Sequence, residues 1–230
     1  MDPYWAVLTE PSKKGGRWDA PSFFASGERE IEEAIARTNA LGLVTAHGQA
    51  LDYGCGVGRL SRALSARFES VIGVDFSESM LEEARRANAG IANLHFERND
   101  GRSLAMIADA TVDFLYSVIA LQHSPPAAQR AVIGEFARVL APGGVAVFQT
   151  PSRPRVDTLS GLAFRLLGNR VLNGPRRLVH GEGRVMEVHA LPREDVVRLL
   201  ETGGLEVRGI DRHDVAGPAF ESYRYFARKG

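Results

Sequence analysis

The residues from Leu51 to Leu60 read L-D-Y-G-C-G-V-G-R-L and decide how the chain folds. Gly54, Gly56 and Gly58 carry no Cβ atom, so their turn can take unusual dihedral angles and a ligand can lie directly against its backbone. An apolar run ends in this stretch and a helical pattern follows it at once. The stretch therefore predicts a strand, a glycine turn and a helix N-terminus, which is the arrangement that binds nucleosides in open α/β sheets.

Short apolar runs alternate with amphipathic stretches on both sides of this turn, from about residue 47 to residue 150. Such alternation is typical of consecutive βαβ units around a parallel sheet, and each run is apolar enough to be covered on both faces. We therefore predict a doubly wound, mostly parallel α/β sheet. The expected strands are Ala50 to Tyr53, Ser70 to Asp75, Leu94 to Arg98, Val112 to Val118 and Val145 to Thr150.

Helices are expected between these strands because their apolar residues recur at helical spacing. Ser79 and Glu82 have the spacing of a capping box at the start of the second helix. Pro142, Gly143 and Gly144 should end the third helix and turn the chain into the next strand. The expected helices are Arg59 to Arg67, Met80 to Ala89 and Ala127 to Leu140.

The rest of the chain elaborates this core, so we expect one domain over residues 1–230. Residues 1–46 should form an N-terminal cover, with an aromatic, turn-rich start (Tyr4, Trp5, Trp18, Phe23, Phe24) and a helix from about Glu28 to Asn39. Residues 47–150 form the core, residues 151–190 break its rhythm as an inserted lid segment, and residues 191–230 close the domain. The closing elements expected are a helix at Arg193 to Glu201 and strands at Val207 to Ile210 and Tyr223 to Arg228.

Composition excludes several classes of protein. The 230 residues contain 28 Lys plus Arg and 28 Asp plus Glu, so no net field attracts nucleic acid. The single cysteine, Cys55, allows no internal disulfide and no thiolate metal cluster, which fits a reducing compartment and predicts no bound metal. Neither a signal peptide nor a run of about 18 apolar residues is present. We expect a cytoplasmic protein without a membrane span.

Asp75 stands at the end of the second expected strand, where a carboxylate can accept both hydroxyls of a ribose. The competing cofactor is NAD, whose fingerprint spaces its glycines G-x-G-x-x-G, whereas this chain has G-x-G-x-G. Asp52, two residues before Gly54, would repel a diphosphate yet can organise the loop or a bound amino group. S-adenosylmethionine carries no phosphate, so it suits this acidic turn better. A plain strand-end cap stays open for Asp75.

The chain resembles a class I S-adenosylmethionine-dependent methyltransferase, over about residues 48–150 and more loosely to the C-terminus. The resemblance rests on the glycine turn, on Asp75, on Asn99 and Asp100 after the third strand, on S-V-I-A-L-Q-H from Ser117 to His123, and on L-A-P-G-G-V-A-V-F from Leu140 to Phe148. It implies a Rossmann-like methyltransferase fold of seven strands with the last one antiparallel. It also implies S-adenosylmethionine as the cofactor and transfer of its methyl group to a small-molecule acceptor, on oxygen or nitrogen.

The resemblance implies a set of residues that contact the cofactor. Alternatives remain at three positions, because Asn99 and Asp100 also make an ordinary turn and Cys55 also fits as a small packing residue. The expected cofactor contacts are Asp52, Tyr53, Gly54, Cys55, Gly56, Gly58, Asp75, Phe76, Met80, Asn99, Asp100, Gly101, Ser117 and Val118.

Two histidines are the candidates for catalysis. A sulfonium is already an activated leaving group, so a base is needed only where the acceptor must lose a proton. His123 follows the fourth strand at its C-terminal end, where ligands bind in such sheets, and its ordinary pKa is about 6.5. His189 is the second candidate, because methyltransferases of similar layout line the acceptor pocket at that point. A histidine that only shapes the loop stays an alternative for His123.

The insertion carries a surplus of positive charge that allows an anionic acceptor. Seven arginines stand against three acidic residues in residues 151–190. A lid over an anionic small molecule and a solvated surface loop both explain this surplus. The apolar run from Leu159 to Leu167 fits a lipid-like acceptor and a helix packed on the core equally well. The arginines are Arg153, Arg155, Arg165, Arg170, Arg176, Arg177 and Arg184, and the acidic residues are Asp157, Glu182 and Glu187.

Two functions from other classes remain as alternatives to methyl transfer. A dinucleotide-dependent oxidoreductase would need its third glycine one residue later than Gly58. A noncatalytic module would keep the fold and bind the cofactor without turning over any acceptor. The sequence specifies neither the acceptor nor the oligomeric state.

Overall fold

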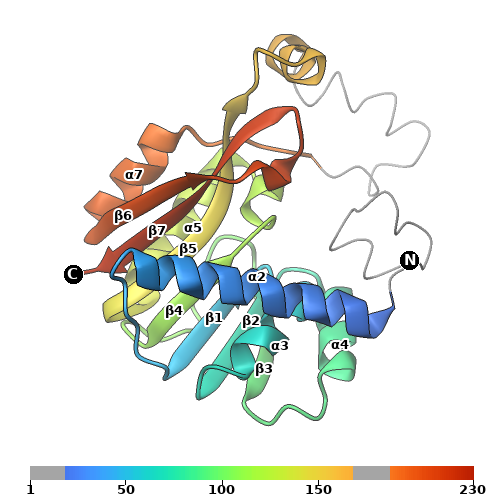
Figure 1. Cartoon of the computed structure of the whole chain (residues 1–230), viewed down its shortest axis with the longest axis vertical. Helices are drawn as coiled ribbons and strands as arrows, with labels where there is room; N and C mark the ends of the chain where they lie inside the picture. The colour runs from blue at the N-terminus through green and yellow to red at the C-terminus, as the bar shows by residue number, and fades with distance from the viewer. Residues whose placement is uncertain (1–18, 168–186) are drawn as a thin grey trace.

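The computed structural model describes residues 19–167 and 187–230. These residues form a seven-stranded sheet in the order β3-β2-β1-β4-β5-β7-β6, with helices on both faces (Figure 1). The first five strands pair in parallel, and β7 is antiparallel to β5 and β6. The predicted doubly wound sheet and its antiparallel last strand are confirmed. The strands are β1 (Gln49–Tyr53), β2 (Ser70–Asp75), β3 (Leu94–Arg98), β4 (Val112–Ser117), β5 (Leu140–Pro154), β6 (Leu205–Arg212) and β7 (Phe220–Lys229).

The strand order places a switch point between β1 and β4. Chain connections run from β1 outward to β2 and β3, and then cross back to β4 on the other side of β1. At such a point two neighbouring connections leave in opposite directions, so the carboxyl ends of the strands open a crevice for a ligand. The glycine turn after β1 lies at this crevice.

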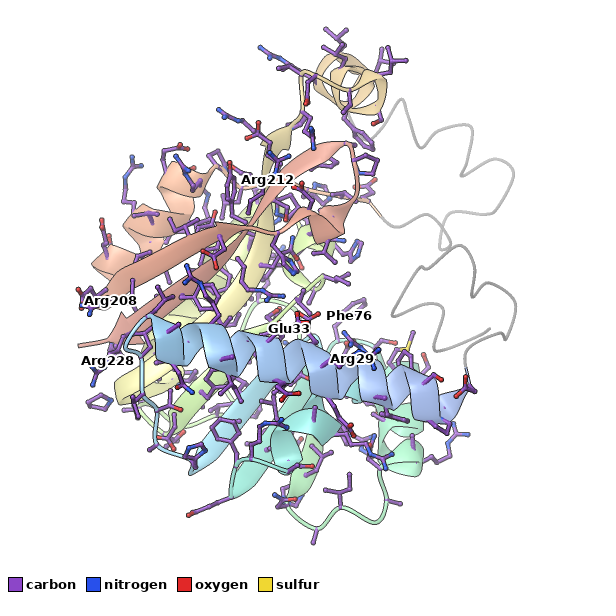
Figure 2. The ribbon with its side chains drawn as sticks, viewed as in Figure 1. Arg29, Glu33, Phe76, Arg208, Arg212 and Arg228 are labelled. Carbon is purple, nitrogen blue, oxygen red and sulfur yellow. The ribbon has the colours of Figure 1, made fainter. Side chains whose placement is uncertain are left out.

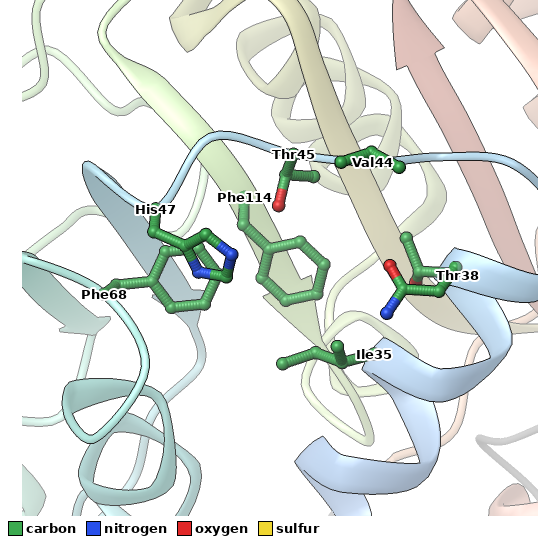
Figure 3. A pocket seen from close by; sticks show the side chains of 8 residues that line it. Ile35, Thr38, Val44, Thr45, His47, Phe68 and Phe114 are labelled. Atoms are coloured by element: carbon green, nitrogen blue, oxygen red, sulfur yellow. The ribbon is translucent and has the colours of Figure 1, made fainter.

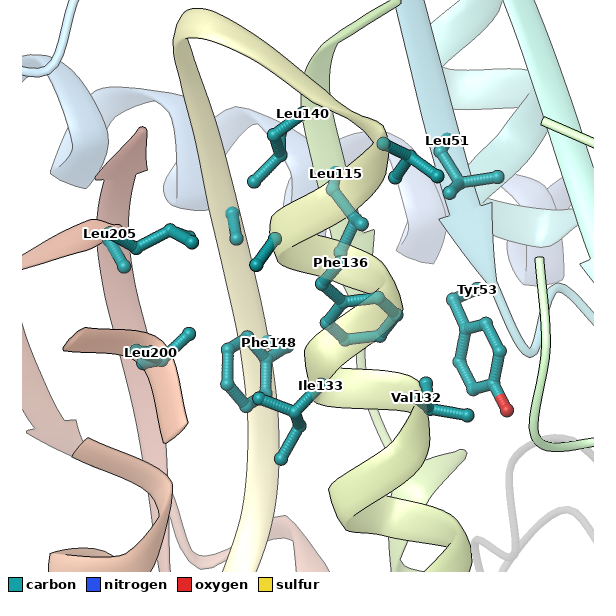
Figure 4. Packing of buried hydrophobic residues seen from close by; sticks show 14 of the residues in the cluster. Leu51, Tyr53, Leu115, Val132, Ile133, Phe136, Leu140, Phe148, Leu200 and Leu205 are labelled. Atoms are coloured by element: carbon teal, nitrogen blue, oxygen red, sulfur yellow. The ribbon is translucent and has the colours of Figure 1, made fainter. Parts of the chain in front are cut away.

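One face of the sheet is covered by α5 (Pro126–Val139) and α7 (Arg193–Thr202). Phe136 of α5 packs edge to face on Phe148 of β5 with ring centroids 5.6 Å apart (Figure 4). Phe148 also stacks on Tyr225 of β7, with ring centroids 5.2 Å apart. These large rings belong to a buried apolar cluster, and burial of apolar surface is the dominant favourable term in folding. The α7 helix adds Leu200, which is fully buried in the same cluster.

The opposite face is covered by α2 (Ala20–Ala40), α3 (Arg59–Ser65) and α4 (Glu78–Ala87). The α2 helix begins at Ala20, so the prediction of a helix starting near Glu28 was wrong. Asp19 is its N-cap and accepts the Ser22 N–H, and a proline in the first turn presets the helical φ angle. Phe23 and Phe24 therefore lie inside the helix and are buried, while Tyr4, Trp5 and Trp18 lie outside the described residues.

Gly27 lets α2 approach α3 closely. A Cβ atom at Gly27 would lie 2.5 Å from the Arg59 carbonyl oxygen and 2.9 Å from its Cγ atom. Arg59 is the first residue of α3, directly after the glycine turn. Farther along α2, Glu30 accepts the Tyr116 hydroxyl at 2.6 Å and pairs with the Arg224 guanidinium. The N-terminal helix is thereby attached to the elements that form the crevice.

Some predicted boundaries shift. The capping box at Ser79 was wrong, because α4 begins at Glu78 with Ser77 as N-cap, and the Ser77 N–H donates to the Asp75 carboxylate instead. The predicted stop at Pro142 to Gly144 was wrong, because α5 already ends at Val139 and β5 starts at Leu140 and runs through these residues, with Gly143 at φ +80°. A glycine can take that dihedral angle inside a bulged strand.

A small surface hollow lies far from the crevice, at the amino ends of the parallel strands (Figure 3). Its lining includes Ile35 and Thr38 of α2, His47 before β1 and Phe68 before β2. It contains none of the predicted site residues. Within residues 19–167 and 187–230, no helix combines the length and the apolar character needed to cross a membrane.

Candidate functional site

The glycine turn is held by hydrogen bonds from its own backbone. The N–H groups of Gly54 and Cys55 both donate to the Val74 carbonyl, at 2.8 and 3.0 Å, and the Gly58 N–H donates to the Cys55 carbonyl at 2.9 Å. Gly54, Gly56 and Gly58 have φ angles of +77°, +54° and +81°, which side-chain-bearing residues rarely adopt. The three glycines are therefore required by the backbone of the turn.

Asp75 joins the end of β2 to this turn. Its Oδ2 atom accepts the Gly56 N–H at 3.0 Å and its Oδ1 atom accepts the Ser77 N–H at 2.9 Å. Burial raises the pKa of Asp75, and the two backbone donors oppose that shift by favouring the carboxylate. Each oxygen retains a further lone pair, and the residue is only partly buried. Asp75 can therefore accept hydroxyl groups from a ligand lying on the turn.

Asp52 lies behind the turn and is 1% exposed. Its Oδ2 atom accepts the Ser61 hydroxyl at 2.6 Å. Burial raises the pKa of Asp52 to about 6, although Ser61 and the nearby Arg59 charge act in the opposite direction. Of the two roles predicted for Asp52, these contacts support organisation of the loop.

The stretch from Asn99 to Gly101 follows β3 at the same edge of the sheet. The Asn99 N–H donates to the Asp75 carbonyl at 3.0 Å, which brings the third strand end to the second. One Asp100 oxygen accepts the N–H groups of Arg102 and Ser103, and these bonds lower the Asp100 pKa. The other Asp100 oxygen is not used in these bonds, so a turn role and a ligand contact are compatible.

Several predicted cofactor contacts differ in their exposure. Phe76, which directly follows Asp75, is 68% exposed, an uncommon state for so large an apolar ring (Figure 2). Met80 is partly buried and packs against the cluster of Phe23, Phe24 and Val57. The Tyr53 ring is buried against Phe136, and burial raises its hydroxyl pKa to about 12. Phe76 is therefore the apolar surface at this edge that a flat ligand ring can cover.

The end of β4 holds a strained residue that the sequence did not reveal. The Ser117 hydroxyl donates to the Tyr53 carbonyl at 2.9 Å and Val118 is buried, so both brace the strand end. Ile119 follows with a φ angle of +68°, and its N–H donates to the Gln149 side chain at 3.0 Å. A branched residue with positive φ is strained, and such strain clusters at functional sites.

The two predicted histidines come together, although 65 residues lie between them in the chain. The Nδ1 atom of His123 lies 2.9 Å from the Glu187 carbonyl, which can only accept, so Nδ1 carries the proton. The His189 N–H donates in return to the Gln122 carbonyl at 2.8 Å. The His189 ring lies 3.1 Å from the Glu187 carboxylate. The turn after β4 and the segment before α7 therefore form one unit.

The protonation of His123 suits a base. Burial lowers its pKa, the hydrogen bond to Glu187 partly opposes this, and the neighbouring His189 lowers it further. With the proton on Nδ1, the lone pair is on Nε2, which lies 3.3 Å from the Gln122 amide nitrogen. A neutral imidazole at neutral pH can take a proton from a bound molecule.

Other groups at this edge do not supply a nucleophile or a metal site. Cys55 is 4% exposed, and burial raises its thiol pKa well above the usual range, so the reactive thiolate is disfavoured. Among the described residues, no group of three or more His, Cys, Asp or Glu side chains is placed to hold a metal. The chemistry of the described site thus rests on carboxylates, backbone amides and histidines.

The described part of the insertion shows paired charges and an exposed apolar helix. Arg153 pairs with Glu221 at 2.8 Å and Arg155 with Asp157 at 2.6 Å. Residues 159–167 are helical and expose several leucines, of which Leu159 is 89% exposed. The remaining predicted arginines after Arg165 lie outside the described residues, so the anionic-acceptor lid stays a prediction.

The residues of the turn fit S-adenosylmethionine better than a dinucleotide. The buried Asp52 places a carboxyl group at the turn, which disfavours a diphosphate there, whereas a carboxylate at the position of Asp75 suits the ribose of either cofactor. A Cβ atom added at Gly101 would meet nothing within 4 Å, so the loop after β3 leaves open space at this residue. Asp75 and Phe76 can hold the ribose and the adenine ring of such a cofactor.

Comparison with known proteins agrees with this assignment. Residues 50–144 match the family model described as "Methyltransferase domain". The chain is 33% identical over 163 residues to trans-aconitate 2-methyltransferase of Methylobacterium nodulans, covering 69% of this chain and 57% of that protein. It is 34% identical over 162 residues to malonyl-[acyl-carrier protein] O-methyltransferase of Pectobacterium atrosepticum, covering 68% and 61%. The chain thus spans about three fifths of the length of these relatives.

Solved structures share the fold at low sequence identity. Magnesium protoporphyrin IX methyltransferase from Synechocystis PCC 6803, solved with bound SAH, superposes with a TM-score of 0.62 at 20% identity, covering 99% of this chain and 93% of that one. The PH0226 protein from Pyrococcus horikoshii superposes with a TM-score of 0.63 at 18% identity over the whole of both chains. These likenesses concern the fold.

Proposed function

The chain belongs to the class I S-adenosylmethionine-dependent methyltransferases, and from this premise we propose that it transfers a methyl group to a small-molecule acceptor. The observation that carries the proposal is the bond between Asp75 and the Gly56 N–H at the switch point of the sheet. This contact sets a ribose-accepting carboxylate beside a glycine turn with G-x-G-x-G spacing, where a dinucleotide fingerprint would place its glycines differently.

The cofactor, when bound, supplies a methyl group on a positively charged sulfur. In our proposal Asp75 accepts the ribose hydroxyls, Phe76 covers the adenine ring, and Asn99 and Asp100 lie near the adenine amino group. The positive charge on sulfur already activates the leaving group, so the protein accelerates the reaction mainly by alignment. Holding two reactants in line can lower the barrier by roughly 7 to 11 kcal/mol. The rigid turn and the braced end of β4 serve that alignment.

Carboxylic acids are the first acceptor class to test. Two relatives are named for the acceptors trans-aconitate and malonyl-[acyl-carrier protein]. A carboxylate is ionised at neutral pH and needs no base. With such an acceptor His123 would only shape the site. The insertion, in which Arg153 and Arg155 form ion pairs, would lie on the acceptor side.

A hydroxyl or amine acceptor is the second candidate, and the state of His123 favours it. The lone pair on Nε2 would repel a carboxylate, whereas it can accept a proton from a hydroxyl or an ammonium group. With that acceptor His123 acts as the general base and His189 stays beside it. The two acceptor classes therefore predict different rates for a variant without His123: unchanged with a carboxylate acceptor and reduced with a hydroxyl or amine acceptor.

The experiment is a binding measurement followed by a turnover screen. Calorimetry with S-adenosylhomocysteine should give a 1:1 complex, with NADH as the matched control that should not bind. Methyl-labelled S-adenosylmethionine is then incubated with panels of small carboxylic acids, phenols and amines, and the products are weighed. Tight binding of NADH without binding of S-adenosylhomocysteine would refute the proposal.

Binding of S-adenosylhomocysteine without turnover of any acceptor would support the noncatalytic alternative. A cytoplasmic location is part of the same proposal, and its support is the sequence, whose single cysteine leaves no partner for an internal disulfide. We also propose the division of the chain into an N-terminal cover, a cofactor core, an acceptor-side insertion over residues 151–190 and a closing region. The contact of His123 with Glu187 supports that role for the insertion.

A further inference from the structure

A buried glutamine on α5 bonds both segments that carry the candidate histidines. Gln129 has no exposed surface. Its amide nitrogen donates to the Ser124 carbonyl at 2.8 Å and to the His189 carbonyl at 3.2 Å. Its amide oxygen accepts the Thr150 hydroxyl at 3.0 Å. One side chain therefore connects the turn after β4, the segment before α7 and the end of β5.

The orientation of this amide follows from the chemistry of its neighbours. Two carbonyl oxygens face one end of the Gln129 amide, and carbonyl oxygens only accept, so the NH₂ group must lie there. The hydroxyl of Thr150 can donate to the remaining oxygen. A carboxylate or a hydrocarbon at position 129 would take the donor away from both of these part-buried carbonyls, which is unfavourable.

The contact of Gln129 adds to a reciprocal pair of bonds between the same two segments. His123 donates from Nδ1 to the Glu187 carbonyl, and His189 donates from its backbone to the Gln122 carbonyl. Ser124, which directly follows His123, is a Gln129 partner. The His123 ring therefore keeps its acceptor only while the segment at Glu187 stays docked.

We propose that Gln129 is a positioning residue that fixes the proton of His123 on Nδ1 by holding the segment of Glu187 and His189 against the turn after β4. The inference rests on the proposed function for its catalytic meaning, because it keeps the lone pair on Nε2, the ring nitrogen that would take the acceptor's proton in place of its 3.3 Å contact with the Gln122 amide nitrogen. Its structural content, the tautomer and titration of His123, can be measured without any acceptor.

Loss of this contact should change His123 in a definite direction. Without a fixed carbonyl acceptor, the imidazole populates both tautomers, as an isolated histidine does. Burial is the largest cause of the low pKa of His123, so a loosened segment that admits water raises this pKa toward its ordinary value.

The test is nuclear magnetic resonance of ¹⁵N-histidine-labelled protein, as a function of pH, on the wild type and three variants. Gln129→Leu keeps the volume and removes the two donors. Thr150→Val is the matched control, since it removes the third bond of the same amide and keeps both donors. His123→Ala assigns the His123 signals. Calorimetry with S-adenosylhomocysteine accompanies each variant.

We expect the wild type and Thr150→Val to show the Nδ1–H tautomer of His123 and a low pKa. Gln129→Leu should show mixed tautomers and a raised pKa, with affinity for S-adenosylhomocysteine within about threefold of the wild type, a factor corresponding to under 1 kcal/mol. An unchanged tautomer and pKa in Gln129→Leu would overturn the proposal, as would equal changes in both variants.

A fold defect is separated by circular dichroism and by Gln129→Met, which lacks the donors but keeps an unbranched side chain. If Gln129→Leu unfolds, Gln129→Met carries the same expectation and the same refutation. Failure of the proposed function would appear differently, as a wild type that does not bind S-adenosylhomocysteine while the His123 tautomer still depends on Gln129.

Discussion

The backbone N–H of Gly56 donates to the Asp75 Oδ2 atom at 3.0 Å, so the turn after β1 is bonded directly to the end of β2. The other oxygen of the same carboxylate accepts the Ser77 N–H. Asp75 is thus fixed by two elements and still has lone pairs for a ligand.

Asp75→Ala should weaken binding of S-adenosylhomocysteine by at least about tenfold, because a hydrogen bond to a charged group contributes about 1.5 to 3 kcal/mol. Isothermal calorimetry measures the affinity, and circular dichroism checks the fold. Glu97→Ala is the matched control, since Glu97 is an exposed acid at the end of β3. Equal affinities for both variants would remove Asp75 from the site.

Gly54→Ala should destabilise the domain by more than about 2 kcal/mol, from positive φ and from a clash together. A Cβ atom at Gly54 would lie 2.1 Å from the Ala120 Cβ atom. The double variant Gly54→Ala/Ala120→Gly should regain only the part of the unfolding free energy that the clash removes, because the positive φ angle remains. Gly42→Ala is the control, because Gly42 has φ +72° with open space around it. Urea unfolding gives all values, and identical losses at Gly42 and Gly54 would contradict the clash.

Asp52→Asn should stabilise the protein at pH 7. The folded-state pKa of Asp52 is about 6, above its ordinary 3.8, so the folded protein binds the proton more tightly and loses stability as pH rises from about 4 to about 6. The amide avoids this loss, with a gain of up to ~3 kcal/mol at pH 7 that vanishes below pH 4. Thermal unfolding at pH 3.5 to 7.5 measures it, and a pH-independent difference would refute the assignment.

His123→Ala should slow methyl transfer to a hydroxyl or amine acceptor by about 10²- to 10⁴-fold while changing cofactor affinity little. Because burial holds the His123 pKa below its usual range, the base is neutral at pH 7, and the wild-type rate should fall only when pH drops below 6.5. Steady-state kinetics as a function of pH measures this fall in rate on the acidic side. A variant with normal kcat would exclude His123 as the base, and a carboxylate acceptor predicts that outcome.

The sequence predicted the strands well where turn residues bound an apolar run on both sides. Ser70–Asp75 and Leu94–Arg98 have the predicted limits. The start of α2 was missed because Asp19 and Pro21 are residues that are typical of a turn. The structure shows that the Asp19 side chain instead caps the helix by accepting the Ser22 N–H. Residue propensities and hydrophobic patterns predict that a helix is present, whereas side-chain caps such as Asp19 determine the residue at which it begins.

The candidate site was predictable as a set of residues but not as an arrangement. Asp75 and the glycines follow from their places at strand ends, which parallel topology brings to one edge. The meeting of His123 with His189 depends on the path of the chain after β5, which no local pattern encodes. Gln129 and Gln149 were missed because a polar residue in a helix or strand suggests a surface position, whereas both are fully buried.

The ring of His123 is oriented by a peptide oxygen, not by the side chain of residue 187. Every amino acid has that oxygen, so the contact with His123 does not depend on which side chain stands at position 187, and the Glu187 carboxylate contacts the His189 ring instead. Related enzymes can therefore share the contact between this histidine and the carbonyl of residue 187 while having different amino acids at that position. Only superposed backbones would detect it.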